Sequence, residues 1–168
     1  KQRNLMYTDA AYTNLEQKSK SSEGRIIFLK NKEGEIQPLL WKSRRISRTA
    51  ISVKGAETIS LVDGLEDVIY LSEIYKEIYR CEQIPIRIFV DNRSLVDSIH
   101  STKLVDEKGL RVYIARIQED LELRRVDSID WIPTSEMLAD SLTKRGAKSD
   151  GLIGVMETGR LCKDQCAG

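Results

Sequence analysis

Two short, mostly apolar runs in this 168-residue chain lead directly into an aspartate, and this constrains the fold more than any other feature. Asp9 follows the run 5–8, and Asp91 follows the run 86–90. Runs of this length and composition predict strands. If the two strands are parallel neighbours, both carboxylates lie at the same edge of the sheet, where they repel each other unless a cation is close.

Three strands are expected before the longest helix. The ranges 5–12, 25–29 and 36–43 have strand character. A polar stretch at 14–24 suits a hairpin loop, and the cluster 31–34 suits a turn. Together these segments predict an antiparallel meander.

Helices and strands alternate in the rest of the chain. The expected elements are a long helix over 54–79, a strand over 85–90, helices over 94–100 and 110–123, a strand over 126–132, and a last helix that Thr134 or Ser135 caps and Gly146 ends. This order predicts an α/β fold in which a five-stranded mixed sheet, antiparallel in strands 1–3 and parallel in strands 4 and 5, is flanked by helices. We expect one domain over 1–146 and a C-terminal tail over 147–168 with one short helix at 150–158.

The amino-acid composition alone excludes few classes of function. Lys and Arg total 27 against 26 Asp and Glu, so a nucleic-acid surface must come from local clusters of charge. No run approaches the roughly 20 apolar residues of a membrane span, so we expect no membrane partner. Three cysteines in the chain favour a reduced, intracellular setting. The pair Cys162 and Cys166 is weak as a metal motif, because the chain supplies no second pair of ligands.

Two further acids could join the edge of the sheet. Glu57 opens the long helix, where the positive end of the helix dipole stabilises a carboxylate, and Asp140 lies near the start of the last helix. Any acid taken alone is best interpreted as a solvated surface group. Four acids in these contexts instead indicate a site for Mg²⁺, which prefers oxygen ligands. Two such ions, roughly 3.5–4 Å apart, can hydrolyse a phosphodiester without a protein nucleophile.

The same residues carry a resemblance to a known family. The motifs are Tyr7-Thr-Asp-Ala10, Trp41-Lys-Ser43, Ala56-Glu-Thr58, Val90-Asp-Asn92 with Ser94, and Trp131-Ile-Pro-Thr134 leading into Leu138-Ala-Asp-Ser-Leu-Thr-Lys144. On these motifs, residues 5–146 resemble the RNase H domain of the Pol polyprotein of copia-type LTR retrotransposons. The last block is the most specific.

The resemblance implies an RNase H-like fold and endonucleolytic hydrolysis of the RNA strand of RNA–DNA hybrids during reverse transcription. It implies a reverse transcriptase domain in the same polyprotein as partner, and an intracellular location in a cytoplasmic particle. Two Mg²⁺ ions, which Mn²⁺ can replace, would be the cofactors. Asp9 would bridge both ions, Asp140 would hold the ion that activates water, and Glu57 with Asp91 would hold the ion facing the leaving group. The products would carry a 3′-hydroxyl and a 5′-phosphate.

Polar and basic residues near the acids are candidate substrate contacts. The candidates are Asn92, Ser94, Ser52, Arg44, Arg45 and Arg48. The first three are expected to contact 2′-hydroxyls across the minor groove, although each could equally cap a helix or lie in a loop. The arginines are expected to face phosphates, with solvated charges at a strand end as the alternative.

Alternatives to an active nuclease stay open. Copia-type domains usually carry a histidine where this chain has Gly109, and other RNases H often have one between the fifth strand and the last acid, where this chain has none. A catalytically weak RNase H-like domain, binding hybrid or acting as a structural module beside a reverse transcriptase, is therefore the second hypothesis. Proofreading exonucleases and integrases of the same superfamily are disfavoured, because alanines follow Asp9 and because Glu57 precedes Asp91.

Overall fold

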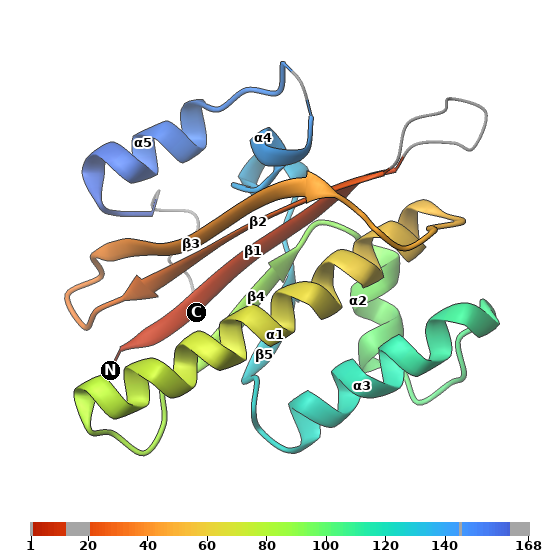
Figure 1. The fold of residues 1–168 in the computed structure, drawn as a ribbon, viewed down its shortest axis with the longest axis horizontal. Helices are drawn as coiled ribbons and strands as arrows, with labels where there is room; N and C mark the ends of the chain where they lie inside the picture. The colour runs from red at the N-terminus through yellow and green to blue at the C-terminus, as the bar shows by residue number, and fades with distance from the viewer. Residues whose placement is uncertain (1, 13–20, 145, 162–168) are drawn as a thin grey trace.

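A five-stranded mixed sheet forms the centre of the computed structural model, which describes residues 2–12, 21–144 and 146–161 (Figure 1). The strands are β1 (Arg3–Ala11), β2 (Ser22–Lys30), β3 (Ile36–Arg45), β4 (Ile86–Val90) and β5 (Ser128–Trp131). They lie in the order β3-β2-β1-β4-β5, antiparallel from β3 to β1 and parallel from β1 to β5. The predicted mixed sheet is confirmed, and β1 and β4 are indeed parallel neighbours.

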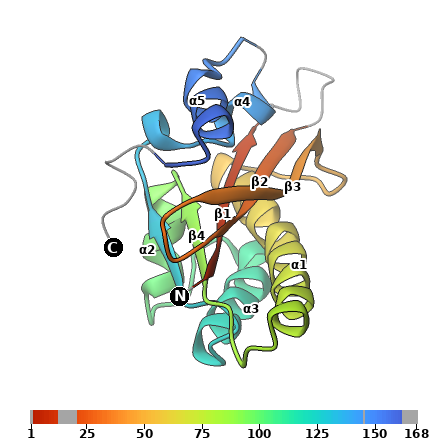
Figure 2. The same cartoon turned by 90° about the vertical axis from the view of Figure 1, so that its left-hand side faces the viewer.

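Helices cover both faces of the sheet. They are α1 (Val53–Tyr79), α2 (Arg93–His100), α3 (Arg111–Glu122), α4 (Asp140–Thr143) and α5 (Asp150–Thr158), with 3-10 turns at Lys108–Leu110 and Thr134–Glu136. Figure 2 shows α4 and α5 on the side of the sheet opposite α1 and α3. Among the residues that the structure describes, no helix combines the length and the apolar content needed to cross a membrane.

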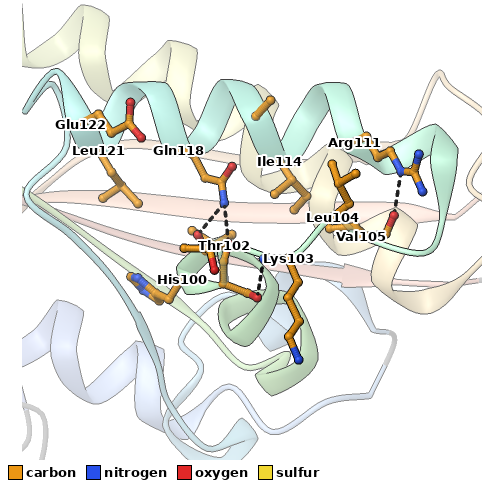
Figure 3. Close-up of a pocket in the computed structure, with 13 residues that line it drawn as sticks. His100, Thr102, Lys103, Leu104, Val105, Arg111, Ile114, Gln118, Leu121 and Glu122 are labelled. Carbon is orange, nitrogen blue, oxygen red and sulfur yellow. Dashed lines mark hydrogen bonds between the residues drawn. The ribbon is translucent and has the colours of Figure 1, made fainter.

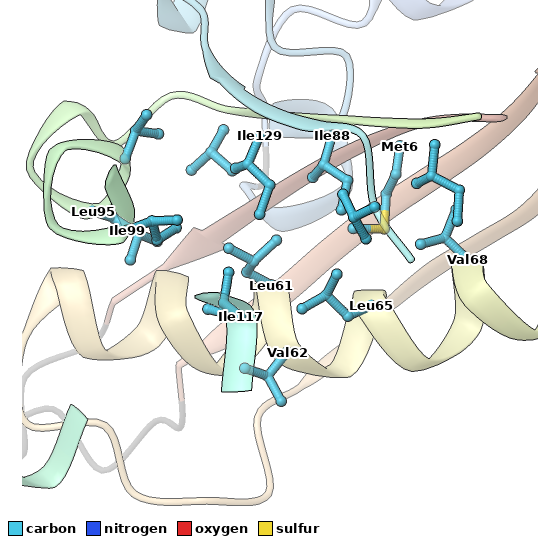
Figure 4. Close-up of a cluster of buried hydrophobic side chains, with 14 of the residues drawn as sticks. Met6, Leu61, Val62, Leu65, Val68, Ile88, Leu95, Ile99, Ile117 and Ile129 are labelled. Atoms are coloured by element: carbon cyan, nitrogen blue, oxygen red, sulfur yellow. The ribbon is translucent and has the colours of Figure 1, made fainter. Parts of the chain in front are cut away.

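The two largest of three hydrophobic cores lie on opposite faces of the sheet, because neighbouring residues of a strand point to opposite faces. Met6 packs in the larger core with Leu61 and Leu65 of α1 (Figure 4). Leu5 and Tyr7 pack in the smaller core, on the face that α4 and α5 cover. Burial of each such side chain stabilises the fold by about 1.5–3 kcal/mol, so α1 is held firmly against the sheet.

The predicted last helix is wrong. In place of one helix from residue 134 to 146, the chain forms a 3-10 turn at Thr134–Glu136, an extended residue at Met137 and the single turn of α4. Met137, Leu138 and Ala139 are consecutive and all buried in the smaller core. A regular helix would turn one of three consecutive residues away from that core, so packing breaks the helix.

The predicted hairpin loop at 14–24 is also too long. Residues 14–20 of it lie outside the described residues, but Ser22, Glu23 and Gly24 belong to β2 and pair with β1. β3 likewise runs on to Arg45, which pairs with Ser22. The polar side chains at this end of the sheet give no apolar signal, and an ion pair between Glu23 and Arg44 links β2 to β3 there.

The segment expected as a C-terminal tail contributes to the smaller core. Val155 of α5 and Leu161 are buried there, and the backbone N–H of Ile36 donates a hydrogen bond to the carbonyl of Gly159, at 2.8 Å. α5 occupies the range 150–158 that was expected for a short helix. The division of the chain at residue 146 stays a prediction.

Gly24 lets α4 pack directly on β2. A Cβ atom at this position would lie 2.8 Å from Leu142 Cβ, 2.8 Å from Thr143 Cγ2 and 3.1 Å from the carbonyl oxygen of Ala139. Gly24 is also the residue of β2 that pairs with Asp9. The missing side chain therefore brings the single turn of α4 close to Asp9 of β1.

We expect Gly24→Ala to lower the free energy of unfolding by about 1–3 kcal/mol, because the added methyl group overpacks the contact with α4. Gly154→Ala is the matched control, since no heavy atom lies within 4 Å of a Cβ built there. In a helix this control should be neutral or stabilising by up to about 1 kcal/mol. Urea unfolding measures both, and a Gly24→Ala protein as stable as its parent would contradict the close packing.

Candidate active site

Three carboxylates converge at one edge of the sheet. One carboxylate oxygen each from Asp9, Glu57 and Asp91 lies within 4.8 Å of the other two. The last paired residues of β1 and β4 are Tyr7 and Phe89, and each aspartate stands two residues further along the chain. The parallel register therefore brings Asp9 and Asp91 side by side, as expected from the sequence.

Asp9 lies within β1, which continues to Ala11, and not at the strand end that the sequence suggested. Its side chain is 1% exposed, and Thr143 of α4 donates a hydrogen bond to its Oδ2 atom. Its backbone carbonyl accepts a hydrogen bond from Ser60 Oγ of α1, at 3.1 Å. Both faces of the sheet thus hold the residue at the centre of the cluster.

Glu57 reaches the cluster from α1. It lies just beyond the first turn of the helix, not within it as predicted, and is 3% exposed. Its Oε1 atom accepts a hydrogen bond from the backbone N–H of Ala10, at 3.2 Å. Its buried Oε2 atom has no hydrogen-bond partner among the described residues. An unpaired carboxylate oxygen in a buried position is costly, so this atom is suited to a cation.

Asp91 directly follows β4, as predicted, and is half-buried. Thr134 Oγ1 donates a hydrogen bond to its Oδ2 atom, at 2.9 Å, and Trp131 Nε1 donates to its backbone carbonyl, at 3.1 Å. Thr134, which follows β5, therefore fixes the orientation of this carboxylate.

Asp140 begins α4 and lies beside the three-acid cluster without being part of it. Its Oδ1 atom forms an ion pair with Lys144 Nζ. Its negative charge still acts on Asp91, so the four acids share one electrostatic environment. Sequence reasoning therefore placed all four acids in one region, with three in direct convergence.

The carboxylates strongly perturb one another. Burial raises the pKa of Glu57 well above its usual value, and the charges of Asp9 and Asp91 add to this effect. Burial and then the charge of Asp9 also raise the pKa of Asp91, although the hydrogen bond from Thr134 opposes the change. Raised carboxylate pKa values mean that the cluster holds its full negative charge only at a cost.

Lys144 supplies positive charge to this region. Partial burial acts to lower the pKa of its ammonium group, but the hydrogen bond to Asp140 and the charges of Asp9, Asp140 and Asp91 outweigh burial and raise it. With Asp9, Glu57 and Asp91, Lys144 lines the shallow pocket over the cluster. The pocket is therefore acidic with one ammonium group at its rim.

The donor set fits a hard divalent cation. All the converging ligand atoms are carboxylate oxygens, and one of them, Glu57 Oε2, is buried without a partner. Oxygen ligands of this kind suit Mg²⁺ or Mn²⁺ better than the softer metals that prefer sulfur and imidazole. Asp9, Glu57 and Asp91 could hold such an ion.

The polar candidates for substrate contact include two helix caps. Ser52 Oγ accepts a hydrogen bond from Gly55 N at the start of α1, and Asn92 Oδ1 accepts one from Leu95 N at the start of α2. Asn92 also lines the acidic pocket, and its Nδ2 group makes no hydrogen bond among the described residues. Ser94 is exposed in the first turn of α2.

The three candidate arginines differ in their partners. Arg44 forms ion pairs with Glu23 and Asp63, and Arg48 also pairs with Asp63. Arg45 is exposed, and no acid pairs with it among the residues that the structure describes. Arg45 is therefore the one of the three whose charge is not already neutralised by a neighbour.

A larger groove between α2 and α3 lies apart from the acids (Figure 3). Gln118 Nε2 donates hydrogen bonds to the carbonyls of Ile99 and Ser101, and Arg111 Nε donates to the carbonyl of Val105. These polar groups hold the connecting segment on α3. His100, at the end of α2, has its Nε2 atom 3.0 Å from the carbonyl of Ile129 and does not line the acidic pocket.

Sequence reasoning did not assign the residues that orient the acids. Ser60, Thr134 and Thr143 each bond to one of the clustered aspartates. Thr143 and Lys144 stand three and four residues after Asp140, the spacing at which helix residues become neighbours. That spacing could have indicated that Thr143 and Lys144 lie near the acids. The hydrogen bond from Ser60 to Asp9 joins residues 51 positions apart, and no sequence pattern indicates it.

Comparison with solved structures identifies the fold. The chain is 20% identical to LC11-RNase H1, solved in complex with an RNA/DNA hybrid, with a TM-score of 0.59 over 83% of this chain and 93% of that one. The N-terminal RNase H domain of rv2228c from Mycobacterium tuberculosis gives 15% identity and a TM-score of 0.61, over 93% and 97% of the two chains.

A foamy viral protease-reverse transcriptase, in complex with an RNA/DNA hybrid, matches at 16% identity with a TM-score of 0.59. The match covers 83% of this chain and 19% of the viral one. No protein-family model matches the chain. The protein therefore has the RNase H fold, as the resemblance implied.

The raised pKa of Glu57 predicts a pH-dependent stability in the metal-free protein. The folded state keeps the proton to higher pH than the unfolded state, so the free energy of unfolding should fall as the pH rises between the two pKa values. Glu57→Gln stays neutral, so it should be more stable than the parent at pH 8 in a chelator, with the difference shrinking towards pH 4.

Glu66→Gln is the matched control, since Glu66 is an exposed residue of the same helix. Chemical unfolding at several pH values measures all three proteins. A Glu57→Gln variant that is less stable than the parent at pH 8 would show that the carboxylates do not repel one another as described.

Proposed function

We propose that this chain is a ribonuclease H that uses divalent metal ions to hydrolyse the RNA strand of RNA–DNA hybrids endonucleolytically. The observation that carries the proposal is the convergence of Asp9, Glu57 and Asp91, with one buried carboxylate oxygen left without a partner. The RNase H fold supports it, since two of the neighbours are described in complex with RNA/DNA hybrid.

Asp9, Glu57, Asp91 and Asp140 are the residues that would hold the metal. Bound Mg²⁺ or Mn²⁺ would supply Lewis acidity, lowering the pKa of water and neutralising charge on the phosphate. The protein holds the carboxylates in place through Thr134, Thr143 and Ser60, so that they need little reorganisation when substrate binds. No step depends on histidine, because His100 is the only one in the chain and lies elsewhere.

Substrate would lie across the acidic pocket. Asn92 lines this pocket with a free side-chain amide nitrogen, so it is the strongest of the candidates for a sugar contact. Ser94 and Ser52 stand at the starts of α2 and α1, near the same end of the sheet. Contacts of this kind distinguish RNA from DNA through the 2′-hydroxyl and not through base sequence.

We further propose that a copia-type LTR retrotransposon encodes this chain. The block that runs from Trp131 to Lys144 is its most specific support. The domain would act beside a reverse transcriptase of the same Pol polyprotein, within a cytoplasmic particle. The match to one part of a foamy viral protease-reverse transcriptase is consistent with such a partner.

The alternative function is a catalytically weak domain that binds hybrid or serves as a structural module. One observation favours it: Arg44 and Arg48, two of the three arginines expected to face phosphate, form ion pairs within the protein. A domain of this kind would bind hybrid without cutting it, so a cleavage assay separates the two functions.

The parent protein is expected to cut the RNA strand of a hybrid with Mg²⁺ or Mn²⁺, and Asp91→Asn should reduce the rate about a hundredfold or more, because a lost metal contact is worth several kcal/mol. The variant should stay folded, since it removes one charge from a repulsive cluster. Asp106→Asn, at an exposed site, is the control. If Asp91→Asn cuts as fast as the parent, the site assignment is wrong, and a parent that binds hybrid without cutting it supports the alternative.

Arg45→Ala should weaken hybrid binding and reduce the slope of log affinity against log salt by about 1, because one phosphate contact is lost. Lys32→Ala is the control, because Lys32 is an exposed cation in the turn at the other end of β2 and β3. Fluorescence anisotropy over a salt series, in an Asp91→Asn background, measures binding without cleavage. If the two alanine variants give equal slopes of log affinity against log salt, Arg45 does not contact the hybrid.

A further inference from the structure

One ammonium group, that of Lys144, lines the pocket over the acids. Lys144 Nζ pairs with Asp140 Oδ1, and its charge also interacts with Asp9 and Asp91. Arg93 is the other cation of the described residues that lines the pocket, but its guanidinium stacks 5.0 Å from the centre of the Trp131 ring and lies near Asp97. Lys144 is therefore the cation that compensates the acids directly.

The backbone that carries Lys144 is fixed to the sheet. Ser22 Oγ of β2 donates a hydrogen bond to the carbonyl of Thr143, at 3.0 Å, and Ser43 Oγ of β3 donates to the carbonyl of Leu142, at 2.6 Å. The backbone N–H of Lys144 donates to the carbonyl of Asp140, at 3.2 Å. The α-carbon of Lys144 consequently has a set place beside the cluster.

The side chain of Lys144 has more freedom than its backbone. It is 44% exposed, whereas its partner Asp140 is 21% exposed. A lysine ammonium is a compact charge on a flexible four-carbon stem, so it can leave the acids for solvent without moving α4. Lys144 lines the same pocket as Asp9, Glu57 and Asp91, so its ammonium group and a divalent ion bound there would repel each other.

From these observations we infer that Lys144 is a resident counter-cation, which neutralises part of the acidic cluster in the metal-free protein and lowers its affinity for divalent ions. The inference rests on the proposed metal-dependent function. It gives Lys144 a role distinct from phosphate contact: the residue stabilises the empty site and sets the metal concentration at which the site fills. When metal binds, divalent ions would replace the Lys144 ammonium group as the positive charge beside the acids.

Three variants test the inference in the absence of substrate. Lys144→Gln removes the charge, Lys144→Arg keeps it, and Lys148→Gln removes the charge of an exposed lysine four residues later. Calorimetric titration with Mn²⁺ measures affinity, and thermal unfolding at pH 8 in a chelator measures the stability of the metal-free fold. Both measurements are independent of hydrolysis.

Lys144→Gln should bind Mn²⁺ about tenfold more tightly than the parent, because one positive charge is removed from the pocket that would hold the ion. It should also melt at a lower temperature in the chelator, because the carboxylates lose their compensating charge. Lys144→Arg should stay close to the parent in both measurements, and Lys148→Gln should match the parent. Tighter metal binding is not expected from a residue whose role is only structural.

Unchanged or weaker Mn²⁺ binding by Lys144→Gln, with a parent that binds the ion, overturns the inference and leaves the proposed nuclease intact. Unchanged thermal stability in the chelator also overturns it, because the cluster would then not need the ammonium group. A parent that binds no Mn²⁺ contradicts the proposed function itself, and the inference falls with it.

Discussion

Repulsion among carboxylates at one edge of the sheet is the constraint on which the rest of this structure depends. The parallel pairing of β1 with β4 forces Asp9 and Asp91 together, and the packing of α1 on the sheet adds Glu57. A fold would not keep such an arrangement for stability alone, since each added negative charge raises the cost of the others. The surrounding contacts therefore serve to hold the acids together against their own repulsion.

Several contacts share this task. Thr143 and Thr134 each donate a hydrogen bond to an aspartate, and Ala10 N donates one to Glu57. α4 can provide the first of these only because Gly24 lets it approach β2. The smaller core, which Met137, Leu138 and Ala139 help to fill, thus supports the site from the face of the sheet opposite α1.

The sequence was sufficient to predict the sheet, the long helix and the region where the acids meet. Strands such as β4 and the helix α1 carry regular apolar patterns that reflect burial, and Asp9 and Asp91 stand next to such patterns. The last helix was mispredicted because helix-forming residues occupy a stretch in which three consecutive side chains are buried. Tertiary packing overrides local propensity there.

The charged contacts were harder to predict, because they join residues that are distant in sequence. Arg44 of β3 pairs with Glu23 of β2 and with Asp63 of α1, and Arg48 also pairs with Asp63. Two arginines that were expected to contact phosphate therefore belong to a network of ion pairs within the protein. Lys144 ends the motif that begins at Leu138, and its position in the sequence does not show that its side chain lies among acids. A count of charges along the chain does not show which of them already have partners.

The function proposed for this protein requires that these acids form a metal centre. A crystal structure of the protein grown with Mn²⁺, with anomalous scattering recorded to locate the ions, tests it most directly. We expect anomalous peaks bound by oxygens of Asp9, Glu57 and Asp91. Side chains that point apart, or a cluster without anomalous density when hybrid and Mn²⁺ are both bound, would contradict it.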